Sequence, residues 1–141
     1  MEIRILTQDA IKEVMPIKEA IEADKEALKM YSEGSANIPL RANLDVPEHE
    51  GQSLYMYGYA PKANALGVKI VSVYPKNIEK GLNSVPATMV NLDAETGQVS
   101  TLMDGTYLTR LRTGAIAGAA TARFLRCLVP VDRQKHSWKP F

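Results

Sequence analysis

Residues 104–126 read DGTYLTRLRTGAIAGAATARFLR, and this stretch predicts one long helix around which the rest of the chain is organised. Asp104 is suited to cap the first turn, and Thr106 offers a second capping hydroxyl. Two glycines in the body each cost about 1 kcal/mol, so we expect close packing against this helix to compensate. Apolar residues at helical spacing predict a buried stripe, formed by Leu108, Leu111, Ala115, Ile116 and Ala119.

Arg112 lies inside this predicted stripe, one turn after Leu108, whereas Arg110 faces the other way. An unpaired buried charge is very costly, so we expect Arg112 to meet an anion. The sequence leaves two kinds of partner open. One is the carboxylate of a ligand, and the other is a structural ion pair with an acid such as Asp104 or Asp93.

The overall charge argues against two classes of partner. The 141 residues include 17 basic and 16 acidic side chains, so we expect no nucleic-acid or membrane-surface binding driven by bulk charge. No apolar run approaches the roughly 20 residues that a membrane span needs. A single cysteine, Cys127, excludes an internal disulfide and fits a reducing compartment. With no signal-peptide pattern at the N-terminus, a cytoplasmic location is the expectation.

The order of the segments predicts an α+β fold. We expect a mixed or antiparallel sheet of five to six strands, packed with N-terminal helices and the long helix near 104–126. A helix begins after Thr7, and a second is predicted at 17–32, ended by Gly34. A long loop is predicted at 75–86 and a Gly97 turn at 93–97. The predicted strands are 3–6, 40–46, 53–60, 66–74, 87–92 and 98–103.

Lys69 and Arg41 are the other candidate functional cations. Lys69 lies in the middle of a β-branched strand. It is either an edge or snorkelling lysine, or a lysine in an apolar pocket with a lowered pKa and an affinity for anions. Arg41 falls on the polar face of its strand and, taken alone, is typical of a solvated charge. Together with Arg112, these residues suit a small carboxylate, which arginine grips bidentately.

Other sites find little support in the sequence. His49, His136 and Cys127 do not have metal-ligand spacing, so no metal site is predicted. There is no P-loop and no G-x-S-x-G, and Gly114 with Gly118 indicates close helix packing, not dinucleotide binding. A tyrosine-rich strand face is typical of a core or, slightly more, of an interface, and here it comprises Tyr55, Tyr57 and Tyr59.

Three segments together resemble a known family. They are LGVKIVSVYPKN, the turn DAETG, and LMDGTYLTRLRTGAIAGAAT with its DG-x-x-L-T-x-L-R-T-x-A core. This combination resembles the ornithine cyclodeaminase/mu-crystallin family of NAD(P)-dependent enzymes. The resemblance implies that residues 1–126 form a substrate-binding and dimerisation domain, whose strands join those of a second subunit in a barrel-like shell.

The resemblance also implies roles for individual residues. Arg41, Lys69 and Arg112 would bind the carboxylate of an amino acid, and Lys69 would lie near the reacting carbon. Ser84 stands where the family has a threonine that approaches the cofactor, and it keeps the hydroxyl. Arg112 and Thr113 would also lie close to NAD.

The chain departs from the family after Arg126. Residues 127–141 read CLVPVDRQKHSWKPF, where the family continues into a strand and G-x-G-x-x-G. We expect this tail to be disordered or non-native. The catalytic aspartate of the nucleotide-binding half is missing as well. We therefore expect the chain to bind NAD weakly and to be inactive by itself.

Three functions remain open at this stage. The first is the substrate-binding, dimer-forming part of an ornithine cyclodeaminase, which converts L-ornithine to L-proline and ammonia with NAD. The second is the same part of an amino-acid or imino-acid dehydrogenase or reductase, such as an alanine dehydrogenase, because the three cations suit any α-carboxylate. The third is a non-catalytic dimerisation or binding module.

Overall fold

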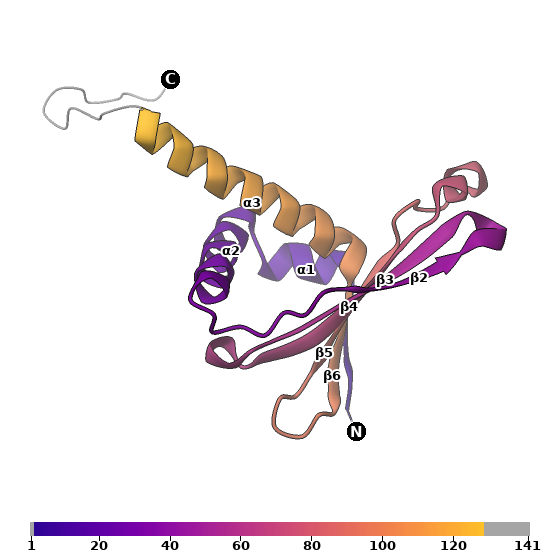
Figure 1. Cartoon of the computed structure of the whole chain (residues 1–141), viewed down its shortest axis with the longest axis horizontal. Helices are drawn as coiled ribbons and strands as arrows, with labels where there is room; N and C mark the ends of the chain where they lie inside the picture. Colours follow the sequence, from indigo (N-terminus) through magenta and orange to yellow (C-terminus); the bar gives the residue numbers. More distant parts are fainter. Residues whose placement is uncertain (1, 129–141) are drawn as a thin grey trace, which may run out of the picture.

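One open, mixed sheet of six strands forms the centre of the molecule. The structure, a computed structural model, describes residues 2–128 (Figure 1). The strand order is β1-β6-β5-β4-β3-β2, with β1 parallel to β6 and every other pair antiparallel. The α+β class predicted from the sequence is confirmed. The strands are β1 (Arg4–Leu6), β2 (Ala42–Val46), β3 (Gly51–Ala60), β4 (Ala65–Val73), β5 (Ala87–Leu92) and β6 (Val99–Asp104).

Three α-helices lie on one side of this sheet, while the β2–β3 end projects away from them (Figure 1). None of the helices within residues 2–128 is long and apolar enough to cross a membrane. The Thr7 hydroxyl accepts a hydrogen bond from the Ala10 amide at 3.4 Å, as its predicted capping role requires. The α-helices are α1 (Gln8–Val14), α2 (Ile17–Ser32) and α3 (Gly105–Leu128), and the 3₁₀ segments are η1 (Pro47–His49), η2 (Pro61–Ala63) and η3 (Pro75–Lys80).

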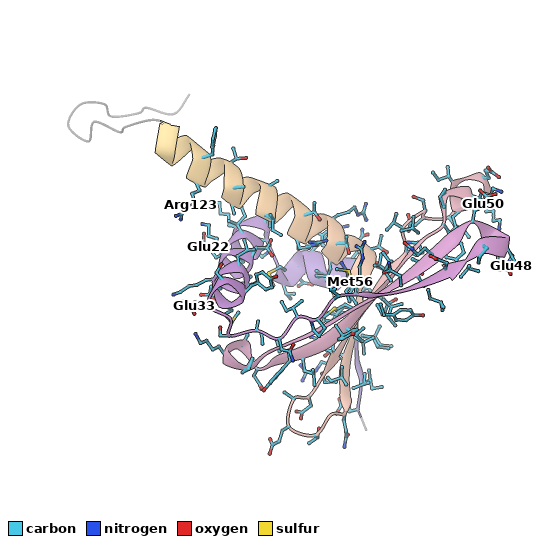
Figure 2. All side chains as sticks on the ribbon, viewed as in Figure 1. Glu22, Glu33, Glu48, Glu50, Met56 and Arg123 are labelled. Carbon is cyan, nitrogen blue, oxygen red and sulfur yellow. The ribbon has the colours of Figure 1, made fainter. Side chains whose placement is uncertain are left out.

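The strand register separates a helix-covered face from an open face. Met56, Lys69 and Met89 are directly paired across β3, β4 and β5, so their side chains share one face. One step along, Leu54 pairs with Val71, and both are buried, at 8% and 6% exposure. This face therefore carries both the core of the sheet and Lys69. Figure 2 shows Met56 where the sheet meets the helices.

Small residues let α3 approach its neighbours, as the sequence predicts. Ala115 is fully buried. A β-carbon built on Gly118 would lie 3.3 Å from the Ile21 Cδ1 atom of α2, which places the two helices in close contact there. Close packing thus offsets the cost of a helical glycine at Gly118. It does not do so at Gly114, since nothing lies within 4 Å of a β-carbon built there.

The start of α3 is tied to β5. The Asp104 Oδ1 atom accepts the Tyr107 amide at 2.8 Å, which confirms Asp104 as a capping residue. Thr106 does not cap the helix, contrary to the prediction. Its hydroxyl accepts the Ala87 amide at 3.0 Å, because this strand residue lies beside the first turn and needs a partner for its N–H. The bond joins the helix to the sheet.

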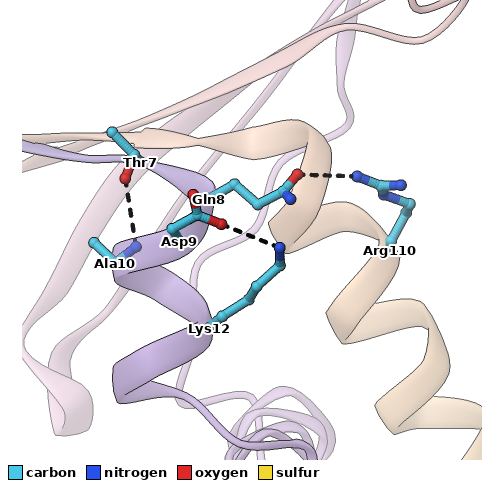
Figure 3. Close-up of polar contacts among 6 residues, drawn as sticks. All are labelled: Thr7, Gln8, Asp9, Ala10, Lys12 and Arg110. Atoms are coloured by element: carbon cyan, nitrogen blue, oxygen red, sulfur yellow. Dashed lines mark hydrogen bonds and ion pairs between the residues drawn. The ribbon is translucent and has the colours of Figure 1, made fainter.

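Polar contacts connect α1 to α3 on the solvent side of the helical layer (Figure 3). The Arg110 guanidinium donates to the Gln8 side-chain oxygen at 3.3 Å. Lys12 pairs with Asp9 at 3.1 Å, and its ammonium lies 5.7 Å from the centroid of the Tyr107 ring. Arg110 therefore faces away from the buried stripe, as predicted, and serves the packing of α1.

The opposite face of the sheet is apolar and has no helix over it. Tyr57 pairs with Val68, and this row continues through Val90 and Leu102 to Ile5. Several large apolar side chains of this face are exposed, at 74% for Ile5, 57% for Leu44, 43% for Tyr57 and 36% for Ile70. Within residues 2–128 the sheet does not close on itself, so the barrel-like shell remains a prediction about a pair of chains.

Some boundaries differ from those predicted. β2 begins at Ala42 and leaves Leu40 and Arg41 outside the strand. The segment 75–86, predicted as a loop, begins with η3. Gly34 and Gly97 have φ of 68° and 72°, which confirms the predicted helix end and turn, because other residues rarely adopt this conformation. The predicted tail 127–141 falls almost wholly outside the described residues.

Candidate carboxylate-binding site

Lys69 lies in the middle of β4, on the face that the helices cover. Its neighbours across the strands are Met56 and Met89, so the side chain rises between two apolar residues. Burial lowers the pKa of the ammonium, and the positive charge of Arg112 lowers it further. Lys69 is thus a partly buried cation near a second cation. An anion bound between them would offset their repulsion.

Arg112 projects from α3 toward the space between Lys69 and α2. Its charge lowers the pKa of Lys69 and also that of Asp24 on α2. The side chain is exposed, so the prediction that it lies within the buried stripe is wrong. The centre of that stripe is Ala115, and Arg112 lies about 60° around the helix from it, at the rim.

The two acids named as structural partners of Arg112 are engaged elsewhere. Asp104 accepts the Tyr107 amide. Asp93 accepts the Glu95 amide, the Thr96 amide and the Thr96 hydroxyl, at 3.0, 2.7 and 2.8 Å. No ion pair found among the described residues includes Arg112. The guanidinium is therefore available to a ligand.

Asp24 is a charged residue of this region that was not among the predicted site residues. Its Oδ2 atom is buried and has no hydrogen-bond partner. Burial raises the pKa of the carboxyl, and the charge of Arg112 acts in the opposite direction. A signal was present in the sequence, because Asp24 interrupts the apolar stripe of α2 formed by Ala20, Ile21 and Leu28.

Arg41 lies just before β2 and is exposed. Extending the β2–β3 register by one residue would place it opposite Met56, which is paired with Lys69. This position is two strands from Lys69, or about 10 Å. In the structure Arg41 lies outside β2 and has no strand partner among the described residues, so its approach to a ligand over Met56 stays a prediction.

Ser84 and Thr113, the predicted cofactor contacts, do not join this group of cations. The Ser84 carbonyl accepts the Tyr74 amide at 2.8 Å, and Tyr74 lies five residues beyond Lys69, about 16 Å along an extended chain. Thr113 is exposed, and its hydroxyl donates to the Thr109 carbonyl at 2.7 Å. The described residues therefore do not form a dinucleotide-binding cradle by themselves.

A hollow of about 330 Å³ opens beside Lys69 on the covered face. Ile38, which lies against Gly58, forms one wall. Asn91 is its only neutral amide, and the lining contains no acidic side chain. Arg112 is not among the residues that line the hollow. The apolar part of the wall includes Met56, Met89, Leu66, Ala60 and Ala65.

No metal centre is formed by the part of the chain that the structure describes. Within residues 2–128, no three histidine, cysteine or acidic side chains come together in a way that could hold an ion. His49 lies in η1 at the far end of β2, remote from the helices. His136 lies outside the described residues. The candidate site therefore consists of the lysine and arginine side chains described above.

Chemically, two neighbouring cations favour a small anion such as a carboxylate. A carboxylate between Lys69 and Arg112 would accept hydrogen bonds from both and neutralise their mutual repulsion. The remainder of the ligand would then extend toward the hollow lined by Met56 and Met89. Because an acid is missing from that lining, a second ammonium group would have no charged partner there.

The fold is a mixed six-stranded sheet with helices over the face that carries Lys69, and the sequence comparison identifies the family to which such a domain belongs. The profile of the ornithine cyclodeaminase/mu-crystallin family matches residues 1–128. The chain belongs to this family, as the resemblance of the three segments between residues 66 and 121 implied.

Three similar proteins illustrate the breadth of the family. Alanine dehydrogenase of Archaeoglobus fulgidus is 37% identical over 127 residues, which is 89% of this chain. The structure of Thermococcus litoralis Δ1-pyrroline-2-carboxylate reductase with NADH and L-proline is 41% identical and superposes with a TM-score of 0.81 over 84% of the chain. An archaeal alanine dehydrogenase dimer with bound NAD is 36% identical, with a TM-score of 0.78 over 84%.

The chain spans little more than a third of the length of these proteins. It covers 37% of the Archaeoglobus fulgidus enzyme and 36% of each of the two solved chains. The matched region contains the whole described fold, including Lys69 and Arg112. The activity of a complete protein of this family is therefore a matter for proposal.

Proposed function

We propose that this chain is the substrate-binding and dimer-forming part of an NAD-linked dehydrogenase or reductase that acts on a small α-amino or α-imino acid. The observation that carries the proposal is the partly buried Lys69 ammonium under the charge of Arg112. Two cations brought together without an anion between them are costly in a part-buried site, and a carboxylate ligand offsets that cost. Arg41 would approach the same ligand from the edge of the sheet.

A substrate with one ammonium or imine group and an uncharged side chain fits the hollow best. Its lining is largely apolar and contains no acid. The amide of Asn91 can accept or donate one hydrogen bond, which suits a neutral polar group. The similar proteins named as alanine dehydrogenase and Δ1-pyrroline-2-carboxylate reductase agree with this choice.

The role of Lys69 follows from its position. A lysine of lowered pKa next to the bound carboxylate would stand near the α-carbon, where its ammonium form can donate a proton to the substrate nitrogen and its neutral amine form can accept one. Arg112 remains charged throughout and would orient the carboxylate. Met56 and Met89 would keep water from one side of the ligand.

The nicotinamide cofactor is expected to depend on residues beyond this chain. Two similar proteins are described with NADH or NAD, and NAD is accordingly the cofactor proposed for the complete enzyme. Among the described residues, Thr113 uses its hydroxyl within α3 and the Ser84 carbonyl accepts the Tyr74 amide, and we infer that most of the dinucleotide site lies outside them. No tight binding of NAD to this chain is expected.

Self-association through the open sheet face is the second part of the proposal. The face carries exposed Ile5, Leu44, Tyr57 and Ile70, and a contiguous apolar surface of this kind marks an interface. A similar alanine dehydrogenase is described as a dimer. We propose a homodimer in which the two open faces meet, as the barrel-like shell expected for the family requires.

A titration of the 141-residue chain tests the site. L-proline and L-alanine at millimolar concentrations should shift the side-chain NMR signals of Lys69 and Arg112, and Lys69→Met or Arg112→Met should abolish the response. Lys80→Met, an exposed change at the end of η3, is the matched control and should leave it intact. No perturbation of Lys69 or Arg112 by either amino acid would refute the proposed site.

The same titration separates the alternatives. L-ornithine binding more tightly than L-proline and L-alanine would favour an ornithine cyclodeaminase, in which L-ornithine yields L-proline and ammonia. A chain that dimerises but binds none of the three would be a non-catalytic dimerisation module. Tight NADH binding by this chain would contradict the proposal that the cofactor is bound mainly by residues beyond it.

A further inference from the structure

A carboxylate oxygen is buried without a partner where α2 packs on α3. This atom is Oδ2 of Asp24. Ile21 lies one turn earlier on the same face of α2 and contacts α3 at Gly118, so Asp24 also points toward α3. Buried acceptors without partners are rare in folded proteins, and each calls for an explanation. The explanation here involves the neighbouring arginine.

Three charged groups of this region influence one another. Arg112 lies close enough to both Asp24 and Lys69 that its charge acts on the pKa of each group. Arg112 and Asp24 do not form a direct pair in the structure, because no ion pair among residues 2–128 includes Arg112. The guanidinium is exposed while the acid behind it is left unpaired.

A second orphaned group lies beside the same arginine. Thr109 is one turn before Arg112 on α3, and its hydroxyl oxygen is buried and has no partner. A helical threonine commonly donates to the carbonyl four residues earlier, as Thr113 and Thr121 do at 2.7 and 2.9 Å. Arg112 therefore lies near two buried oxygens without partners, one of Asp24 and one of Thr109, and either could accept a hydrogen bond from its guanidinium.

We propose that Asp24 is a positioning residue, which takes one edge of the Arg112 guanidinium and turns the opposite edge toward a carboxylate bound at Lys69. This inference rests on the proposed function. A guanidinium carries five N–H donors in a planar fork and can serve two carboxylates at once. With a ligand present, the order becomes Asp24, Arg112, ligand carboxylate, Lys69, so that charges alternate along the row.

The alternation of charges determines whether Asp24 strengthens or weakens ligand binding. The bound carboxylate lies next to two cations and is separated from Asp24 by the guanidinium, so the attractions act over shorter distances than the repulsion. In the same step, the buried oxygen of Asp24 gains the hydrogen bond that it lacks. Removing the negative charge of Asp24 should therefore weaken the binding of the ligand.

Asp24→Asn tests this inference, with L-proline as the probe and the 141-residue chain as the protein. Binding followed by NMR should weaken about tenfold, which corresponds to about 1.4 kcal/mol. In the wild-type chain, the Arg112 Nε–H signal should move downfield on binding, and this shift should be lost in Asp24→Asn. Asp24→Glu, which restores the charge, should recover part of both effects.

Glu22→Gln is the matched control. Glu22 lies on the exposed side of α2, where it pairs with Lys25 at 2.6 Å (Figure 2). The substitution changes the net charge by the same amount as Asp24→Asn, on the same helix. It should leave both the affinity and the Arg112 signal unchanged, whereas a general electrostatic effect would alter them equally.

Unchanged binding in Asp24→Asn, with normal binding by the wild-type chain, would overturn this inference and leave the proposed function intact. Tighter binding would overturn it as well, because Asp24 would then compete with the ligand for Arg112. A wild-type chain that binds neither L-proline nor L-alanine would overturn both; if it binds only L-alanine, the same comparison is made with L-alanine as the probe. If Asp24→Asn does not fold, the Arg112 signal of the wild-type chain tests the inference instead. A guanidinium held on both edges should rotate more slowly when the ligand binds, so an Nε–H shift without slower rotation would contradict the inference.

Discussion

Gly105 touches the backbone of β5 at the point where α3 begins. A β-carbon at this position would lie 2.8 Å from the Ala87 carbonyl carbon and 2.8 Å from the Thr88 nitrogen. Both are backbone atoms of a central strand and cannot move aside alone. This contact fixes how closely the first turn of α3 approaches the sheet, and therefore where Arg112, two turns later, meets Lys69.

Gly105→Ala should destabilise the chain by about 2–3 kcal/mol, since overpacking against backbone displaces the helix start. Gly114→Ala is the matched control on the same helix. Nothing lies within 4 Å of its added methyl group, so it should stabilise the chain by about 1 kcal/mol through helix propensity. Urea unfolding of both variants provides the comparison. Equal effects of the same sign would refute the close approach.

Lys69→Met should raise the free energy of unfolding by on the order of 1 kcal/mol near neutral pH, while abolishing carboxylate binding. Burial and the charge of Arg112 lower the pKa of Lys69 below 10.5, so the folded state releases this proton more readily than the unfolded state. The stability of the wild-type chain relative to Lys69→Met should therefore rise with pH between the lowered pKa and 10.5.

Chemical unfolding of both proteins across that alkaline range measures this difference. Lys80→Met, which removes an exposed lysine, controls for the change in net charge. If Lys69→Met were less stable than the wild type at neutral pH, the charged Lys69 ammonium would not be destabilising the folded chain.

Asp93 should contribute acid-sensitive stability to the β5–β6 turn. Hydrogen bonds from the backbone and the hydroxyl of Thr96 lower the pKa of the Asp93 carboxyl. A lowered folded pKa gives stability that is present above 3.8 and is lost as the pH falls through the folded value. Asp93→Asn keeps an acceptor in the turn but cannot titrate.

The advantage of the wild type over Asp93→Asn should accordingly be largest near neutral pH and shrink in acid. Urea midpoints at several pH values between neutral and acidic conditions provide the readout. A difference that stayed constant over this range would show that the charge of Asp93 is not what the turn uses.

Ile70→Lys should convert the proposed homodimer to a monomer. Ile70 lies on the open face, opposite Tyr55 and Thr88, and is 36% exposed. A lysine in the centre of an apolar interface would be buried unpaired there, which disfavours association strongly. Light scattering after size exclusion measures the mass of each variant.

Val14→Lys on α1 is the control for this change, because Val14 is 63% exposed and lies on the helical side of the sheet. It should leave the mass unchanged. A monomeric wild-type chain, or an Ile70→Lys variant that still forms dimers, would contradict association through the open face.

Local patterns were sufficient to predict the helices and most of the strands. Alternation in 53–60 and 66–74 indicates strands because side chains of a strand point to opposite faces, and β3 and β4 occupy these segments. The alanine-rich run after Asp104 likewise predicts α3. Lys69 and Arg112 could be selected because charges within otherwise apolar patterns are unusual, whereas Arg41 was selected through the family resemblance. All three remain predicted ligands of a carboxylate.

Other features depended on contacts between distant segments. The parallel pairing of β1 with β6 joins residues about a hundred positions apart, and no local pattern specifies it. The exposure of Arg112 follows from which side of α3 faces the sheet, and helical spacing alone does not separate the centre of a stripe from its rim.

The sequence by itself therefore determined the elements, the family and the three candidate cations, because periodicity and side-chain chemistry are properties of neighbouring residues. Only the tertiary structure decided that α2 places Asp24 behind Arg112 and that one sheet face remains uncovered. Charges and apolar surfaces act through space, so their partners are defined only once the helices have packed on the sheet.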